Sequence, residues 1–354
     1  MHIIDRRAFI ASGAALGVAS VVRAEPPAGA KVRAIDSLPL PLGFNGLLAY
    51  GRGGRVQHLR CAGFADVEAR RPVTAATQFK WGSASKWLTS VAVLRLVEQG
   101  SLALDDPITG YLPTFRADTG SRVHLSHLLS NTSGIPDLLS RQIAAEPQLR
   151  TSAATSAEIV ARFGNGDLAF TPGAGWDYAA LNWAIVAAIV SRVTGEPLPA
   201  AVRRLVFQPL KMTGAGFAQA DQPAMPQLAV AYTGTLPLTR KMAPVPPFIA
   251  ASGNVAGTVN DAMRAAHGVF QGSLLRAAAR RELTSVRWPE QDYALGGRVH
   301  AIDGESWAWE AGKVGGYRTH IAHRLSASET IVIFNTTDML QSTIGDWVEA
   351  IARA

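Results

Sequence analysis

Residues 79–90 read Phe-Lys-Trp-Gly-Ser-Ala-Ser-Lys-Trp-Leu-Thr-Ser, which places Ser83 three residues before Lys86 at the start of a helical pattern. On a helix this spacing puts both side chains on one face, within reach of each other. A serine hydroxyl is a weak nucleophile until a base takes its proton, and a desolvated lysine can be that base. The stretch therefore indicates a nucleophile with its activating amine. The alternative is a helix-capping serine followed by a solvated lysine.

Lysine is scarce in this chain, since it supplies only six of the 34 basic residues. An arginine keeps its proton in a protein, whereas a buried lysine can lose it. A lysine three residues after a serine therefore stands where an arginine would fail. The pair Ser83 and Lys86 is also the only Ser-x-x-Lys in the sequence, which favours the functional interpretation.

The first residues have the features of an export signal. Arg6 and Arg7 precede an Ala- and Gly-rich apolar run, and a small-residue cleavage pattern ends at Ala24. We expect residues 1–24 to be a twin-arginine signal peptide, cleaved after Ala24. The run is shorter than the roughly 20 residues that span a bilayer, and no cysteine follows it for a lipid. These features predict a periplasmic or secreted protein without a membrane anchor; the alternative is an ordinary N-terminal helix.

Composition narrows the possible functions. The 354 residues carry a net charge of +7, without zinc-finger spacing, a Gly-rich phosphate loop or a dense basic run. A modest basic excess favours acidic substrates or surfaces only weakly, and the missing motifs argue against nucleic acid as a partner. Cys61 is the only cysteine, so no intrachain disulfide can form. The chain is long enough for a large core in one composite domain or two, and we expect a monomer.

Hydrophobic patterns predict strands at both ends of the chain. Two short β-rich runs flank a glycine turn within residues 47–59, and two more lie at residues 319–322 and 330–334. Residues from about 100 to 220 are mainly helical in pattern, and a last helix is expected over residues 341–353. Strands at both ends with helices between them predict a sheet in which the two ends of the chain meet.

Further segments follow the Ser-x-x-Lys in a fixed order along most of the chain. They are Gly63–Thr77, Ser83–Lys86, Val97–Leu102, Asp105–Pro107, Leu125–Pro136, Thr171–Gly173, Tyr178, Gln208–Met212 and Gly312–Gly316. Together they resemble the serine β-lactamase and penicillin-binding protein family, in particular class C β-lactamases, family VIII esterases and D-aminopeptidases.

The resemblance implies an α+β fold with an antiparallel sheet flanked by helices and an inserted all-helical region. We expect residues 25–100 and 225–354 to form the sheet domain and residues 101–224 to form the helical domain. The active site is then expected at the interface between the two domains.

The resemblance also implies roles for single residues. Ser83 matches the acylated nucleophile, Lys86 the amine that helps to deprotonate it, and Tyr178 the tyrosine of the family's Y-x-N element, which shares the base role. Lys313 matches the lysine of the K-T-G strand, whose charge keeps the tyrosine acidic and attracts a substrate carboxylate. The backbone N–H groups of Ser83 and Gly316 match the oxyanion hole. Neither a cofactor nor a metal is implied.

Two departures from the family pattern reduce the polarity of the expected cleft. Ala180 replaces the asparagine of Y-x-N, and Asn182, two residues further along the helix, points elsewhere. Val314 replaces a hydroxyl residue in the K-T-G triplet. Both changes weaken the recognition of amides and β-lactams more than the chemistry of a simple ester.

The resemblance therefore implies a serine hydrolase that forms an acyl-enzyme on Ser83. Its expected substrate is a small ester, amide or peptide, including cell-wall fragments, and its activity that of an esterase, a D-amino-acid peptidase or a weak β-lactamase. The alternative is a weakened penicillin-binding-like module that binds or traps its ligand without turnover. A metal site is not expected, because the pairs His124/His127 and His320/His323 have no third ligand.

Overall fold

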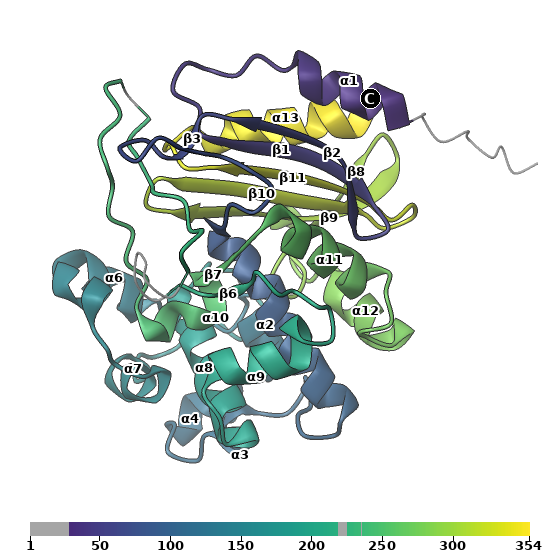
Figure 1. Ribbon diagram of the computed structural model, residues 1–354. Coiled ribbons are helices and arrows are strands. Elements are labelled where there is room, and N and C mark those ends of the chain that lie inside the picture. The colour runs from purple at the N-terminus through teal and green to yellow at the C-terminus, as the bar shows by residue number, and fades with distance from the viewer. Residues whose placement is uncertain (1–27, 219–224, 235) are drawn as a thin grey trace, which may run out of the picture.

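The computed structural model describes residues 28–218, 225–234 and 236–354. The predicted signal peptide, residues 1–24, lies outside the described residues. In Figure 1 the described chain has a sheet half, shown at the top, and a helical half below it.

The main sheet has six strands in the order β2-β1-β11-β10-β9-β8, and the neighbouring strands are antiparallel. Their bounds are β1 (Gly46–Arg52), β2 (Arg55–Ala62), β8 (Arg298–Ile302), β9 (Glu305–Val314), β10 (Tyr317–Arg324) and β11 (Glu329–Asn335). The pairing of β1 with β11, with Leu47 opposite Phe334, joins the two ends of the chain. The predicted hairpin at residues 47–59 and the predicted meeting of the two ends are both confirmed.

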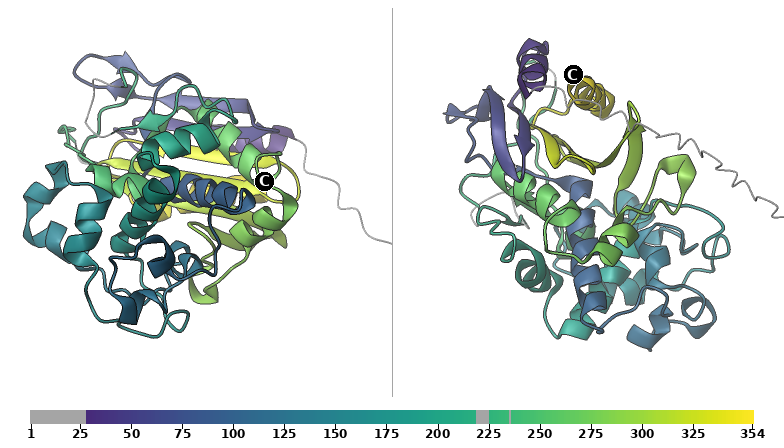
Figure 2. Two further views of the ribbon diagram at one scale, coloured as in Figure 1. Left: turned by 90° about the horizontal axis from the view of Figure 1, so that it is seen from below. Right: turned by 90° about the vertical axis from the view of Figure 1, so that its right-hand side faces the viewer.

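Helices cover both faces of this sheet (Figures 1 and 2). Two terminal helices, α1 (Ala28–Ser37) and α13 (Gln341–Arg353), lie on one face, and α11 (Val259–Phe270) lies on the other. Successive residues of a strand point to opposite faces. Accordingly, Leu48 packs in the cluster under α1 and α13, while Leu47 packs in the larger cluster that continues into the helical half.

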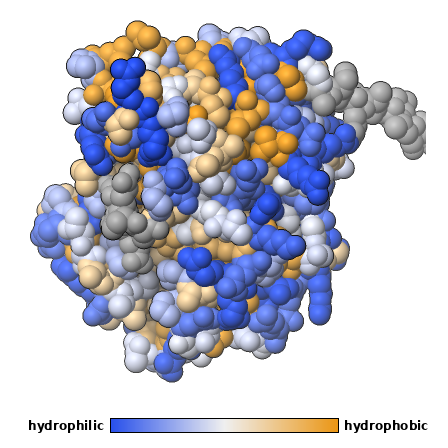
Figure 3. Space-filling view, viewed as in Figure 1, coloured by the Kyte–Doolittle hydropathy of each residue, from blue (hydrophilic) through white to orange (hydrophobic). Residues whose placement is uncertain are grey.

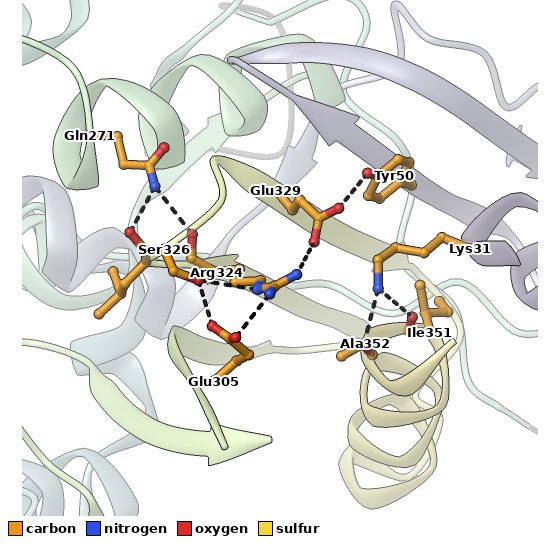
Figure 4. A network of polar contacts seen from close by, with 10 residues as sticks. Lys31, Tyr50, Gln271, Glu305, Arg324, Ser326, Glu329, Ile351 and Ala352 are labelled. Carbon is orange, nitrogen blue, oxygen red and sulfur yellow. Dashed lines mark hydrogen bonds and ion pairs between the residues drawn. The ribbon is translucent and has the colours of Figure 1, made fainter. Parts of the chain in front are cut away.

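Polar contacts hold the terminal helices and the strand ends together (Figure 4). The Lys31 ammonium donates to the carbonyls of Ile351 and Ala352 at 3.3 and 3.0 Å, at the C-terminal end of α13. A cation is stabilising at this end of a helix. On the sheet, the Tyr50 hydroxyl donates to the buried Glu329 carboxylate at 2.7 Å, and Arg324 pairs with the same carboxylate at 3.2 Å.

The helical half lies between the first two strands and the last four along the chain. Its elements are α2 (Ser85–Glu98), α3 (Ile108–Tyr111), α4 (Ala117–Gly120), α5 (Leu125–Leu129), α6 (Leu138–Ala145), α7 (Ser156–Phe163), α8 (Ala180–Thr194) and α9 (Leu198–Val202), with 3-10 turns at Pro147–Thr151 and Pro247–Ile249 and a π turn at Arg203–Phe207. Its centre is α8, in which residues 181–190 are all buried. Gly195 ends α8 at a φ of 71°, a conformation that glycine adopts without strain.

Short elements join the two halves beside the start of α2. They are β5 (Phe79–Lys80), β6 (Gly216–Phe217), β7 (Val255–Gly257) and α10 (Ala250–Gly253). The strand order β5-β7-β6 brings the segment before α2 against residues 256–257, far later in the chain. The remaining elements are the paired strands β3 (Phe64–Asp66) and β4 (Arg71–Pro72), α12 (Ala277–Thr284) and a 3-10 turn at Pro289–Gln291. The domain boundaries given above stay a prediction.

Among the described residues, no single helix is both long and apolar enough to cross a membrane. The helices Ala180–Thr194 and Leu198–Phe207 reach the length and apolar composition of a membrane span only when they are taken together, and the chain bends by 75° between them. On the face drawn in Figure 3, hydrophobic residues are interrupted by hydrophilic ones over both halves.

Candidate active site

Ser83 lies in a tight 3-10 turn, Gly82–Ala84, that leads directly into α2. Gly82 has a φ of 52°, and a Cβ on it would lie 2.7 Å from the amide nitrogen of Lys313 on β9. Glycine is therefore required here, because any side chain would push the turn away from the strand. The close approach puts Ser83 at the N-terminal end of a buried helix and beside the strand amides, where developing negative charge is stabilised.

Lys86 is buried and points at the serine hydroxyl. Its ammonium nitrogen lies 3.1 Å from Ser83 Oγ and 3.0 Å from the carbonyl oxygen of Ser252, and the rings of Tyr178 and Trp183 flank it at 4.6 and 5.6 Å. Burial lowers the pKa of Lys86 to about 7, while Glu310 opposes the shift. A substantial fraction of the amine is therefore neutral near pH 7 and can accept a proton.

Tyr178 reaches the same hydroxyl from the other side. Its phenol donates to Ser83 Oγ at 2.8 Å. Burial raises the pKa of Tyr178 well above its ordinary value, and Glu310 adds to the effect, so the phenol stays protonated. The residue stands just before α8, whose first amides, those of Ala180 and Leu181, donate to the Asp137 carboxylate at 2.8 and 3.3 Å. This cap fixes where the helix begins and thus where the phenol points.

The next polar group at the site is an ion pair on the two last strands of the sheet. Glu310 on β9 is 2% exposed, and Arg298 on β8 donates to both of its carboxylate oxygens at 2.8 Å. The guanidinium also lies 6.0 Å from the ring centre of Tyr178. Burial raises the pKa of Glu310, while Arg298 and Lys86 oppose that shift. Neither residue was among those predicted from the sequence.

The structure corrects the expected register of β9. A Cβ on Gly312 would lie 1.9 Å from the carbonyl oxygen of Trp81, so the backbone of residues 310–313 passes the nucleophile turn. The segment beside Ser83 is therefore Glu310-Ala311-Gly312, and the amide that follows it is that of Lys313. Glu310, not Lys313, occupies the place of the K-T-G lysine, and the side chain of Lys313 is exposed.

Gly316 is not brought to the nucleophile. Residues 315–316 form the turn between β9 and β10, because Val314 pairs with Tyr317. A Cβ on Gly316 would meet the backbone of Tyr232 and the Thr336 carbonyl, not the turn that holds Ser83. The amide placed to act with that of Ser83 is therefore the Lys313 amide. A two-residue Gly-Gly turn between two β-rich runs is a hairpin signal that could have given this register.

The other residues discussed from the sequence have structural partners. Asn182 accepts from the Ser133 hydroxyl at 2.7 Å and donates to Asn131 at 3.3 Å, so its amide holds a buried loop. His124 and His127 stack with ring centres 5.0 Å apart. In the part of the chain that the structure describes, no three metal-binding side chains form a group.

Known proteins resemble this chain in sequence. It is 41% identical to esterase EstB of Burkholderia gladioli over 182 residues, which are 48% of this chain and 46% of the esterase. It is 31% identical to the putative penicillin-binding protein PbpX of Bacillus subtilis over 176 residues, which are 50% of this chain and 42% of that protein. The matches therefore span just under half the length of these relatives.

Solved structures resemble it over more of its length. A D-amino acid amidase from Ochrobactrum anthropi superposes with a TM-score of 0.77 at 18% identity, covering 92% of this chain and 97% of the amidase. A penicillin-binding protein from Bacillus halodurans does so with a TM-score of 0.75 at 23% identity, covering 87% and 96%. The likeness confirms the predicted fold. The family model described as Beta-lactamase matches residues 42–351, and the chain therefore belongs to the beta-lactamase family.

Proposed function

We propose that this protein is a serine hydrolase that forms an acyl-enzyme on Ser83 and releases it with water. One arrangement carries the proposal: Ser83 Oγ lies 3.1 Å from a buried amine and 2.8 Å from a protonated phenol. A nucleophile between a base and an acid is what acyl transfer needs. The esterase and the amidase among its relatives support the same chemistry.

Acylation begins when neutral Lys86 takes the hydroxyl proton of Ser83. The serine oxygen then bonds to the carbonyl carbon of the substrate, and the carbonyl electrons move onto its oxygen. We assign the resulting oxyanion to the N–H groups of Ser83 and Lys313. One such donor is typically worth about 3–4 kcal/mol of barrier.

The tetrahedral intermediate collapses when the leaving oxygen departs with its electron pair and takes the Tyr178 proton. Protonated Lys86 then restores the proton of the phenol, which leaves both groups as they began. In the second half, a water gives its proton to Lys86 and attacks the acyl carbon. The bond from the acyl carbon to Ser83 Oγ then breaks, the serine oxygen takes its proton back from Lys86, and the carboxylic acid is released.

We propose simple esters as the preferred substrates. Ala180 offers no side-chain amide to hold a substrate amide, and Ala311 brings no hydroxyl where the family strand has one. An ester has a better leaving group and depends less on such positioning than an amide or a β-lactam does. Cell-wall peptides and β-lactams should therefore be slow substrates.

A short-chain aryl ester tests the proposal. Purified protein should hydrolyse it, and Ser83→Ala should abolish turnover without changing the thermal unfolding temperature. Intact-protein mass spectrometry should show a transient acyl adduct on the wild type only. Absent turnover, or turnover unchanged in Ser83→Ala, would overturn the proposal. A β-lactam adduct that persists without any ester turnover would instead establish the ligand trap.

We also propose that residues 1–24 direct export by the twin-arginine route and that the mature chain acts as a monomer. The Arg6-Arg7 pair and the apolar run support export. Replacing both arginines with lysine should leave the protein unprocessed in the cytoplasm. Light scattering after size exclusion should give the mass of one chain; one structural neighbour is described as octameric.

A further inference from the structure

A cavity of about 560 Å³ opens beside Tyr178, between strands β8 and β9 and helix α13. Its inner wall includes Trp309, Ala311 and His320, and its outer wall is formed by residues 341–349 of α13. Glu310 and Tyr178 also line it, so the cavity reaches the residue whose phenol contacts Ser83. A volume of this size holds a ring with a short chain.

Flat rings form the inner wall of this cavity. Trp309 stacks on His320 with ring centres 5.1 Å apart and contacts His300 at 5.3 Å. Burial lowers the pKa of His320 to about 3 and also lowers the pKa of His300. Both imidazoles are therefore neutral at pH 7, and the wall carries no positive charge from histidine.

The charges at the cavity are unfavourable for an anion. The cation on its inner wall, Arg298, has its charge compensated by two hydrogen bonds to Glu310. Lys313 lies two residues after Ala311 on β9, and its exposed side chain does not line the cavity. A substrate carboxylate would thus be desolvated without a free partner, which is costly.

Carboxylates stand at the opposite rim, on α13. Glu349 is held by Arg353 at 3.1 Å. Asp346 is exposed and makes no ion pair with another described residue. A cation at this rim would gain from the Asp346 carboxylate, whereas the Trp309 ring is already covered by His320 at 5.1 Å and by the Arg298 guanidinium at 5.2 Å.

We propose that this cavity is a substrate subsite that selects by charge, binding an ammonium-bearing aromatic group best, a neutral one less well and a carboxylate worst. The part of the proposal that concerns turnover rests on the proposed function. The binding order does not depend on it. It is the reverse of the carboxylate preference that a K-T-G lysine would confer.

Three matched ligands test the order: 3-phenylpropylammonium, 3-phenylpropan-1-ol and 3-phenylpropionate. Calorimetric titration of the Ser83→Ala protein measures binding without turnover. We expect the ammonium to bind about 2- to 5-fold more tightly than the alcohol, because it can pair with the exposed Asp346 carboxylate. We expect the carboxylate to bind at least about 5-fold more weakly than the alcohol. A carboxylate that binds as tightly as the ammonium would overturn the proposal.

Two variants locate the effect. Asp346→Asn should reduce the advantage of the ammonium over the alcohol, whereas the matched surface change Asp105→Asn should leave it intact. Gly345→Leu should weaken all three ligands, because Gly345 lines the cavity and a Cβ on it would meet no atom within 4 Å, which leaves room for the leucine side chain to occupy ligand space. Unchanged binding in both Asp346→Asn and Gly345→Leu would place the ligands elsewhere and refute the subsite. If the order holds while the wild type lacks esterase activity, only the proposed function fails.

Discussion

Arg298 donates to both carboxylate oxygens of Glu310 at 2.8 Å, and this pair, from two neighbouring strands, occupies the place where the family pattern has a lysine. The pair is nearly neutral as a whole, but its two members act oppositely on the catalytic amine. Glu310 raises the pKa of Lys86 and Arg298 lowers it. The pKa of the catalytic amine is therefore shifted in opposite directions by two charged residues on adjacent strands.

Replacing Arg298 and replacing Glu310 should shift the acid limb of the pH–rate profile in opposite directions. Arg298→Met leaves Glu310 to raise the pKa of Lys86, so the rise of kcat/KM with pH should shift to higher pH. Glu310→Gln removes that influence, so the rise should shift to lower pH. The measurement is kcat/KM for a neutral aryl ester between pH 5 and 10.

The free energy of unfolding gives a second test of the interaction between Arg298 and Glu310. Arg298→Met buries an uncompensated carboxylate and should cost about 3–5 kcal/mol of unfolding free energy. The double change Arg298→Met with Glu310→Gln should recover part of that loss.

The exposed arginine Arg353 provides the control for the pH prediction, because Arg353→Met should leave the pH–rate profile unchanged. Shifts of the same sign in both single variants would contradict the proposed opposition.

The wild-type enzyme should gain activity as the pH rises through about 7, where the buried Lys86 loses its proton. Because burial raises the pKa of Tyr178, the phenol should add no alkaline limb below pH 10. Lys86→Arg keeps the charge but cannot release a proton, and it should lower kcat/KM about 10²–10⁴-fold. Lys211→Arg, at an exposed lysine, is the matched control. Activity in Lys86→Arg close to that of wild type would exclude Lys86 as the base.

Sequence patterns were sufficient for the groups at or just before the starts of helices. Ser83 and Lys86 meet because a three-residue spacing is a local property of the helix start. Tyr178, far away in sequence, was found because it precedes an apolar helix and matches a family element. The main sheet was equally accessible, since its hairpin and its terminal strands are marked by glycine turns and β-rich runs.

The resemblance to the K-T-G triplet gave the wrong strand register. Lys313-Val314-Gly315 resembles K-T-G in letters, yet the strand presents Glu310-Ala311-Gly312 to the nucleophile. A shift along a strand exchanges every side chain at a site while the composition stays the same. The role of Arg298 could not be predicted from the sequence for the same reason, because its contact with Glu310 depends on how β8 pairs with β9.

Asp137 should be a positioning residue for Tyr178. Its carboxylate accepts from Ala180 and Leu181 at the start of α8 and from Ser140 at 3.1 Å. Asp137→Ala should cost about 0.5–2 kcal/mol of unfolding free energy. It should also lower kcat more than it raises KM, because the phenol loses its alignment with Ser83.

A cap elsewhere separates these two effects. Thr155 caps α7 by accepting from the Glu158 amide, and Thr155→Ala should cost a similar amount of stability. Its kcat should remain that of the wild type. Equal kcat values in the two cap variants would show that Asp137 acts on stability alone.

The close contact between Gly82 and β9 should make this glycine more sensitive than a turn glycine of similar conformation. Gly82 and Gly304 both have positive φ, at 52° and 80°, but a Cβ would meet Lys313 N only at Gly82 and nothing within 4 Å at Gly304. Alanine at either position pays for the backbone strain, and at Gly82 it also forces the nucleophile turn away from the strand. Gly82→Ala should therefore lose about 1–3 kcal/mol more unfolding free energy than Gly304→Ala in urea titrations, together with most of the esterase activity. Equal losses of stability and full activity in both variants would mean that the turn can retreat from β9 without consequence, and that the Lys313 amide is not part of the oxyanion site.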